Sequence, residues 1–287
     1  MLVLVAKDLW WPLGAHLQHI KWARICAMAH GFEFFYRDNS HPVFPNHSIE
    51  DYFLPVSTVE ESAVTPQNRV DYRFEMSTSW ERTGFKSQDY TSPGQFRTDL
   101  LRSIYRLQPK VLEVIEACPA VKSLSGKRYL AMHVRRGDKT TGPYQEIGLV
   151  HLSTYLEACV ELREQTGLNL LAVCTDTQAI LDEIIALNED HGFNLFYTEQ
   201  YRPPNDWQQA DVPLVTSGQA DPNRIAALYP RVLNDFEIML RSAALVGDWG
   251  SNLAAAASEM RSVGLDVDVS AKRVAVSTQK PVVCMGF

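Results

Sequence analysis

A cluster of charged side chains near the middle of the chain is the part best suited to chemistry. Residues 130–139 read LAMHVRRGDK, so an apolar run ends abruptly at Arg135, Arg136, Asp138 and Lys139. Such an apolar run is typical of a buried parallel strand, and ligands bind at the carboxyl ends of these strands. Two planar guanidinium groups suit phosphate oxygens, and a neighbouring carboxylate can hold one of them in position. The cluster therefore predicts a phosphate-binding site at a strand end.

Three other interpretations of this cluster stay open from the residues alone. An arginine pair can form a solvated turn, and the tripeptide Arg136-Gly137-Asp138 matches an adhesion signal. The third interpretation is a nucleic-acid patch. The formal net charge of −7 and the lack of a broad basic stripe argue against it, so no nucleic-acid partner is expected.

The composition is that of a globular enzyme. The 287 residues, of which 46% are hydrophobic and 21% charged, can form one large core or two modest ones. Five scattered cysteines favour buried free thiols over a disulfide framework or a zinc site. The opening MLVLVAKDLWW is too short for a membrane span and lacks a basic leader. We expect a cytoplasmic protein, or a Golgi-lumenal catalytic domain whose leader was removed, with no membrane span in this chain.

The first residues predict a β-α-β unit. Residues 1–6 form the first expected strand, residues 15–30 a helix, and residues 31–36 a second strand. Gly31 has the position of a left-handed cap residue at the end of the helix. The connection Trp10–His16 is either a ligand-facing loop or a packing loop anchored by tryptophan, and both interpretations stay open.

The rest of the chain alternates helices and strands. Residues 95–118 predict two helices, or one kinked helix, interrupted at Pro109, and residues 120–127 a linker that contains the domain boundary. Strands are expected at residues 130–134, 169–174, 193–197 and 243–246, and helices at residues 152–165, 178–191, 224–242 and 253–260. This alternation favours an α/β fold.

Three polar groups follow strands of this second unit. Arg135 and Arg136 follow the first strand, Asp176 the next, and the turn Gly250-Ser251-Asn252 the last one, where it opens a helix. The start of a helix after a glycine turn is a natural seat for phosphate. Together the three groups fit a nucleotide diphosphate, and arginine with a helix N-terminus can neutralise it without a metal.

Other chemistries find less support in the sequence. Asp266-Val267-Asp268 resembles an Asp-x-Asp metal motif, but it lies in a predicted strand, where alternation would turn both carboxylates toward one solvated face. No Walker A loop, Gly-x-Gly-x-x-Gly or Gly-x-Ser-x-Gly motif is present, so NTPase, dehydrogenase and hydrolase functions are not indicated.

Several motifs resemble those of the α-1,6-fucosyltransferases, a group related to the protein O-fucosyltransferases. HVRRGDK is similar to their His-Val-Arg-Arg-x-Asp-Lys motif, and residues 100–117 to their helix pair with an Arg-x-Gln-Pro step. The segment Leu233–Met260 looks like their final motif, and Gly14–Gly31 like their first glycine loop and helix.

The resemblance implies a GT-B-like α/β fold with two facing Rossmann-like domains and parallel sheets. Residues 1–120 would form the acceptor side, and residues 121–287 the nucleotide-sugar-binding domain. The implied activity is inverting transfer of fucose from GDP-fucose to a glycan or glycoconjugate acceptor, with no cofactor and no metal. Transfer of another GDP-sugar, or an inactive protein that binds nucleotide sugars or glycans, are the alternatives.

Roles in donor binding follow from the same resemblance. His133 and Asp235 would read guanine, Arg135 would grip the β-phosphate, and Arg136 with Asp138 would brace the site.

The resemblance adds five further residues of the donor site. Ser251 and Asn252 would cap the diphosphate, Asp176 matches an acid near the nucleotide, and Gly14 and His16 belong to the glycine loop and helix.

The catalytic carboxylate of the family lies in the loop after the lysine of the motif. Here Glu146 is the candidate, with Lys139 assisting its proton relay and Arg135 stabilising the leaving group. The loop between Lys139 and Glu146 is longer than in the family, and Thr177 replaces a family acid. Asp8 and Asp176 are the other candidates for the base.

Overall fold

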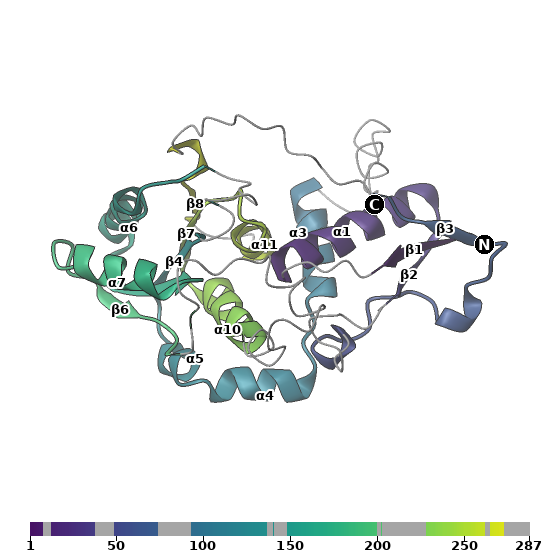
Figure 1. The fold of residues 1–287 in the computed structure, drawn as a ribbon, viewed down its shortest axis with the longest axis horizontal. Helices are drawn as coiled ribbons and strands as arrows, with labels where there is room; N and C mark the ends of the chain where they lie inside the picture. Colours follow the sequence, from purple (N-terminus) through teal and green to yellow (C-terminus); the bar gives the residue numbers. More distant parts are fainter. Residues whose placement is uncertain are drawn as a thin grey trace, which may run out of the picture.

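In a computed structural model, the chain folds into two separate parallel β-sheets with a group of helices between them (Figure 1). The structure describes residues 1–7, 13–37, 49–73, 93–136, 140, 148–199, 202, 228–261 and 265–272.

The N-terminal sheet has three parallel strands in the order β2-β1-β3. Its elements are β1 (Val3–Lys7), helix α1 (Leu13–His30), β2 (Glu33–Arg37), the short 3-10 helices η1 (Ile49–Asp51) and η2 (Glu61–Ala63), and β3 (Arg69–Asp71). Gly31 adopts a positive φ of 67°, which confirms the predicted left-handed cap of α1. The predicted β-α-β opening is therefore correct.

Three helices connect the two sheets: α3 (Pro93–Ile104), α4 (Pro109–Ala117) and α5 (Pro119–Leu124). The predicted break at Pro109 is confirmed, because this proline starts α4. The first half of the predicted linker over residues 120–127 is helical. Pro119 occupies the first turn of α5, and that helix buries Val121 and Leu124 against the core.

The second sheet has five parallel strands in the order β6-β5-β4-β7-β8. Its strands are β4 (Leu130–Val134), β5 (Leu170–Thr175), β6 (Asn194–Phe196), β7 (Ala244–Gly247) and β8 (Val267–Asp268). Its helices are α6 (Leu152–Thr166), α7 (Gln178–Leu187), α10 (Leu228–Arg241) and α11 (Asn252–Arg261), followed by the 3-10 helix η4 (Ser270–Lys272). The strand order reverses between β4 and β7, which makes their carboxyl ends the topological switch point of the sheet.

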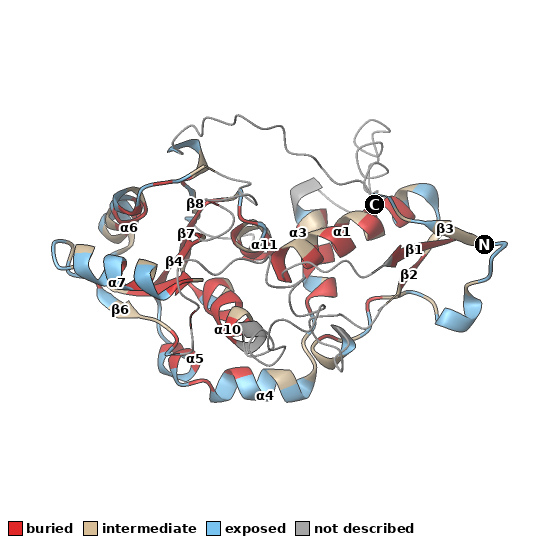
Figure 2. Ribbon diagram, viewed as in Figure 1, coloured by how far each residue is buried: buried red, intermediate tan, exposed pale blue. Residues whose placement is uncertain are grey.

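The two faces of this sheet belong to different cores. Ala131, Cys174 and Leu245 pack with α10 and α11 in the larger core, whereas Met132 and Val173 pack with α6 and α7 in a second core. Figure 2 shows β4, β7 and most of the described part of α10 as buried and the outer face of α7 as exposed. Because side chains alternate along a strand, His133 belongs to the α10 face of β4, like Ala131.

Helix α11 is shared by both halves of the molecule. Glu259 accepts from Lys21 Nζ of α1 at 2.7 Å and pairs with Arg97 Nε of α3 at 3.0 Å. Arg102 of α3 donates from Nε to the carbonyl of Met260 at 2.9 Å. The central helices in Figure 1 are therefore tied across the two sheets by charged contacts at the carboxyl end of α11.

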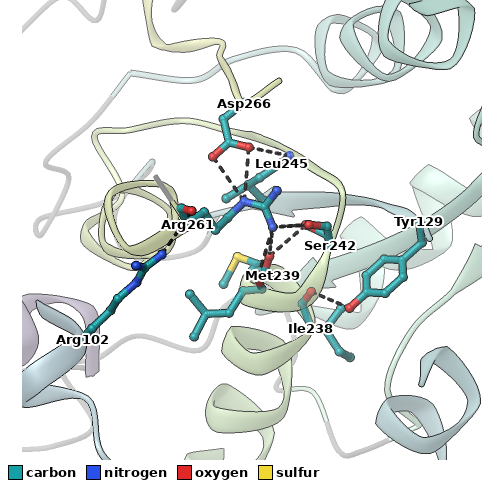
Figure 3. Close-up of polar contacts among 9 residues, drawn as sticks. Arg102, Tyr129, Ile238, Met239, Ser242, Leu245, Arg261 and Asp266 are labelled. Atoms are coloured by element: carbon teal, nitrogen blue, oxygen red, sulfur yellow. Dashed lines mark hydrogen bonds and ion pairs between the residues drawn. The ribbon is translucent and has the colours of Figure 1, made fainter. Parts of the chain in front are cut away.

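Arg261 is the centre of a buried hydrogen-bond network at the same end of α11 (Figure 3). Its Nη1 donates to the carbonyl of Met239 and to Oγ of Ser242, both at 2.8 Å, and its Nε lies 3.2 Å from Asp266 Oδ1. Asp266 also accepts from the backbone N–H of Leu245 at 3.1 Å. The expectation that Asp266 faces solvent is therefore wrong, because its carboxylate neutralises a buried guanidinium.

Four cysteines, Cys26, Cys118, Cys159 and Cys174, are buried free thiols as predicted, and Cys284 lies outside the described residues. No helix in the described part of the chain is long and apolar enough to cross a membrane.

Candidate functional site

An ion pair between Arg135 and Asp176 lies at the carboxyl edge of the five-stranded sheet. Val134 and Thr175 are partners in the parallel pairing of β4 and β5, so the residues that follow them meet. The side chains of Arg135 and Asp176 are 17% and 16% exposed. The backbone N–H of Arg136 also donates to Asp176 Oδ1 at 3.2 Å. Asp176 therefore fixes both the turn after β4 and the guanidinium that the turn presents.

Arg136 serves the scaffold on the other face of the sheet. Its Nη1 donates to the carbonyl of Arg135 at 3.1 Å, and its Nη2 to the carbonyl of Val150. The guanidinium carbon lies 5.8 Å from the ring centre of Tyr155 on α6. With both terminal nitrogens bonded to backbone carbonyls, the side chain braces the turn.

His133 is a buried neutral imidazole beside these charges. Burial, helped by the Arg135 cation, lowers the pKa of His133 to about 3, while the Asp248 carboxylate acts in the opposite direction. Its Nδ1 is buried without a hydrogen-bond partner among the described residues. A neutral imidazole with a buried open nitrogen is suited to hydrogen bonding with a ligand rather than to proton transfer near pH 7.

Asp235 of α10 is a buried carboxyl group on the same face of the sheet. Burial raises its pKa to about 6, although the cations of Arg231 and Arg202 oppose that shift. Thr198, just after β6, donates its hydroxyl to Asp235 Oδ1 at 3.2 Å. The perturbed pKa values of His133 and Asp235 mark this corner as a candidate binding site.

Two buried arginines that were not among the predicted site residues complete this corner. Arg231 donates from Nη1 to the carbonyl of Asp176 at 3.3 Å, and its Nε has no partner in the described chain. Arg202 donates from Nη1 to the carbonyl of Thr198 at 2.8 Å. The spacing of Arg231 one helical turn before Asp235 was a usable signal. Arg202 follows no periodic pattern, so no comparable signal existed for it.

The N-terminus of α11 lies at the end of β7, next to the start of α1. Asp248 shapes the turn, because its Oδ1 accepts from the N–H of Gly250 at 2.8 Å and its carbonyl from the N–H of Ser251 at 2.9 Å. A side chain at Gly14 would collide with α11, since an added Cβ would lie only 2.3 Å from the nitrogen of Leu253. Gly14 thus lets the first turns of the two helices touch, and their positive dipole ends lie close together.

The remaining predicted site residues lie apart from this corner or outside the described residues. His16 is buried in the N-terminal half, where its Nε2 lies 2.7 Å from the hydroxyl of Tyr36. The His16 side chain also lines a small apolar cavity. Asn252 is exposed at the first position of α11. Asp8, Asp138, Lys139 and Glu146 lie outside the described residues. Within the described ranges, no group of three or more His, Cys, Asp or Glu side chains could hold a metal ion.

Comparison with known proteins identifies the fold. No protein-family model matches the sequence, and no curated protein matches it. A crystal structure of NodZ α-1,6-fucosyltransferase soaked with GDP-fucose aligns with a TM-score of 0.51 at 13% identity, covering 90% of this chain and 92% of that one. The fucosyltransferase NodZ from Bradyrhizobium aligns at 0.50 with 14% identity, covering 89% and 92%. POFUT1 with GDP-fucose aligns at 0.48 with 12% identity, covering 90% and 93%, which is too weak a likeness to bear on the fold.

The chain therefore has an α/β GT-B fold with parallel sheets, as the sequence predicted. Because the sequences are only 13–14% identical, the similarity to NodZ establishes the fold of this chain and not its activity. The division into domains at residues 120 and 121 stays a prediction.

Proposed function

We propose that this chain is an inverting, metal-independent glycosyltransferase that moves fucose from GDP-fucose to a hydroxyl group of a glycan or glycoconjugate. The observation that carries the proposal is the corner at the switch point of the five-stranded sheet. There a pre-oriented arginine, an open buried histidine nitrogen and the start of α11 lie around the same strand ends. The chain shares its fold with NodZ, and a crystal structure of NodZ has been obtained after soaking with GDP-fucose.

Donor binding would begin with the diphosphate. The Arg135 guanidinium, held by Asp176, would donate to the β-phosphate, while backbone N–H groups at the start of α11 near Ser251 and Asn252 would receive its other oxygens. Gly14 would act indirectly, by allowing the N-terminus of α1 to add its dipole at this point. His16 would contribute to the first helix rather than to the phosphates.

Guanine would be read at the α10 face of the sheet. The ring N–H and the exocyclic amino group of guanine donate hydrogen bonds, and a carboxylate such as that of Asp235 can accept both. His133 is neutral and can offer Nδ1 as donor or acceptor, according to its tautomer.

The chemical step requires a base and charge neutralisation. We assign the base to Glu146, which would remove the proton from the acceptor hydroxyl, with Lys139 assisting. The acceptor oxygen then forms a bond to C1 of fucose as the bond from C1 to the diphosphate oxygen breaks on the opposite face, which inverts C1. Arg135, braced by Arg136 and Asp138, and the helix N-terminus would stabilise the negative charge that develops on GDP, so this charge needs no metal.

The direct test is turnover of GDP-fucose to GDP by the purified chain, with and without a panel of glycan acceptors. A thermal-shift screen of GDP-fucose, GDP-mannose and UDP-sugars, in which only ligands of the native state raise the melting temperature, identifies the base and the sugar. A shift with GDP-mannose but not GDP-fucose would move the proposal to another GDP-sugar. Binding without turnover for any acceptor would favour a binding protein.

Replacement of the proposed base separates chemistry from binding. Glu146→Gln should lower kcat about 100-fold and leave the Kd of GDP within about twofold, because the amide cannot accept the proton. Turnover close to that of the wild type would reject Glu146 as the base and move attention to Asp8 or Asp176.

A further inference from the structure

The indole of Trp249 fills the space above a glycine at the end of β7. A Cβ added at Gly247 would lie 2.6 Å from Cζ3 and 3.3 Å from Cε3 of Trp249, and 3.1 Å from Cβ of Ala254. The ring therefore occupies the volume that a side chain at position 247 would take, between the strand end and the first turns of α11. Any larger residue at position 247 would push the ring away.

The backbone that carries this ring is held on both sides. The N–H of Trp249 donates to Asp268 Oδ1 at 3.1 Å, and the next N–H, that of Gly250, donates to Asp248 Oδ1 at 2.8 Å. The ring is thus attached to a turn whose successive amides are already bonded to carboxylates. Such a support fixes the orientation of a side chain before any ligand arrives.

The ring lies over a residue that pairs with His133. Gly247 and His133 are partners in the pairing of β7 with β4, and neighbouring strands lie about 4.8 Å apart. Both residues belong to the α10 face, because Leu245 and Ala131, two positions earlier on each strand, pack in the same core. Trp249 keeps part of its surface exposed although it packs against that core. An aromatic ring and an imidazole nitrogen without a partner among the described residues therefore lie on strands that flank the switch point, where ligands of such sheets bind.

We propose that Trp249 is the stacking platform for the aromatic base of the donor nucleotide. The inference rests on the proposed function and assigns a base contact to a residue outside the predicted site. Stacking on an indole strengthens binding of any aromatic base, since every base has a π face. Recognition would then have two parts: Trp249 holds the base by its face, and His133 with Asp235 select it by its edge.

The decisive experiment compares ligands with and without a base in Trp249→Ala. By calorimetry, the variant should bind GDP about 10- to 100-fold more weakly than the wild type, the usual size of one stacking contact. Inorganic pyrophosphate, which has no base, should bind both proteins within about twofold. ADP should lose affinity by a similar factor, because the contact does not depend on base identity.

A spectroscopic arm reports on the ring directly. GDP should quench the tryptophan fluorescence of the wild type, and Trp249→Phe should remove most of that quench. Trp22→Phe is the matched control, because Trp22 packs against the same core but on α1, 4.8 Å from Lys21 Nζ. This control should retain the quench and the Kd of GDP.

Three results would overturn the inference: unchanged GDP affinity in Trp249→Ala, an undiminished quench in Trp249→Phe, or an equal loss of GDP and pyrophosphate affinity. The last result would assign Trp249 a purely structural role in the turn. Failure of the proposed function looks different, since the wild type itself would then bind neither GDP nor pyrophosphate.

Discussion

Two buried arginine clusters lie at opposite ends of the region around α11, and they differ in how completely their hydrogen bonds are satisfied. At the carboxyl end, Arg261 is bonded to Met239, Ser242 and Asp266. Near the amino end, the corner around Arg135 contains buried nitrogens on His133 and Arg231 that have no partner among the described residues.

The difference teaches that burial of charge does not by itself indicate a ligand site. A satisfied network such as that of Arg261 contributes to folding, whereas an unsatisfied buried donor costs about 1–3 kcal/mol and persists where something else bonds it. These nitrogens, open among the described residues, therefore make the Arg135 corner the candidate place for a ligand. Each of the following predictions tests this division.

Removal of Arg135 should have the largest effect. We expect Arg135→Ala to lower kcat/KM by about 1000-fold and to abolish measurable GDP binding, because the proposed phosphate contact of this guanidinium would act in a partly dry site. The melting temperature should fall only moderately, because Asp176 keeps part of its surface exposed and still accepts from the backbone N–H of Arg136. Arg128→Ala is the control, since Arg128 is exposed just before β4. Unchanged GDP affinity in calorimetry would reject the donor site.

Removal of Arg261 should affect stability instead. Arg261→Ala leaves Asp266 and three backbone carbonyls without their buried donor, so the free energy of unfolding should fall by about 3 kcal/mol. Urea denaturation measures this loss. Arg102→Ala, which removes a half-exposed donor to the same helix end, should cost about 1 kcal/mol. If Arg261→Ala retained wild-type stability but lost GDP binding, the division between the two clusters would be wrong.

Replacement of His133 should change how stability depends on pH. The folded-state pKa of His133, about 3, lies below its ordinary value of 6.5. Between these values the unfolded chain binds a proton that the folded protein does not, so stability falls as pH falls, by about 1 kcal/mol per unit. His133→Gln should reduce this loss between pH 6.5 and 4.5, as measured by urea denaturation.

Asp235 provides the opposite sign in the same experiment. Its folded-state pKa, about 6, lies above the ordinary 3.8, so the folded protein binds this proton more tightly and gains stability as pH falls through 6. Asp235→Asn should therefore make the loss of stability below pH 6 steeper than in the wild type. Parallel pH profiles for the two variants would contradict both assignments.

Chelation should have the smallest effect. If Arg135 and a helix N-terminus neutralise the leaving diphosphate, as proposed, EDTA should change turnover of GDP-fucose by less than about twofold. Strong inhibition that added Mg²⁺ or Mn²⁺ reverses would revive a metal-dependent mechanism.

The sequence predicted those parts of the fold that depend on local patterns. The apolar run before His133, the cap at Gly31 and the proline at position 109 each depend on neighbours a few residues away, and the structure agrees with all three. The pairing of Arg135 with Asp176 was also accessible, because both follow strands of one predicted parallel sheet.

What the sequence did not predict depends on contacts between distant segments. Alternation suggested a solvated Asp266, but Arg261 at the end of α11 draws this carboxylate inward. Arg202 reaches Thr198 and the Asp235 corner from a segment without periodicity. Gly14 resembles a glycine of a phosphate-binding loop. A side chain at this position is excluded, however, by the backbone of Leu253, which lies far along the chain. Patterns of neighbouring residues do not predict such contacts, because the partners are distant in the sequence.

The contact between the first and the last long helices also constrains how the protein is made. Lys21 and Glu259 are separated by 238 positions, and α11 emerges from the ribosome long after α1. Until then α1 lacks one of its packing partners, and contacts of such long range form slowly. During biosynthesis, α1 therefore stays without this packing partner until α11 has been made, and a chain that stops before α11 presents an uncovered helix to chaperones and proteases.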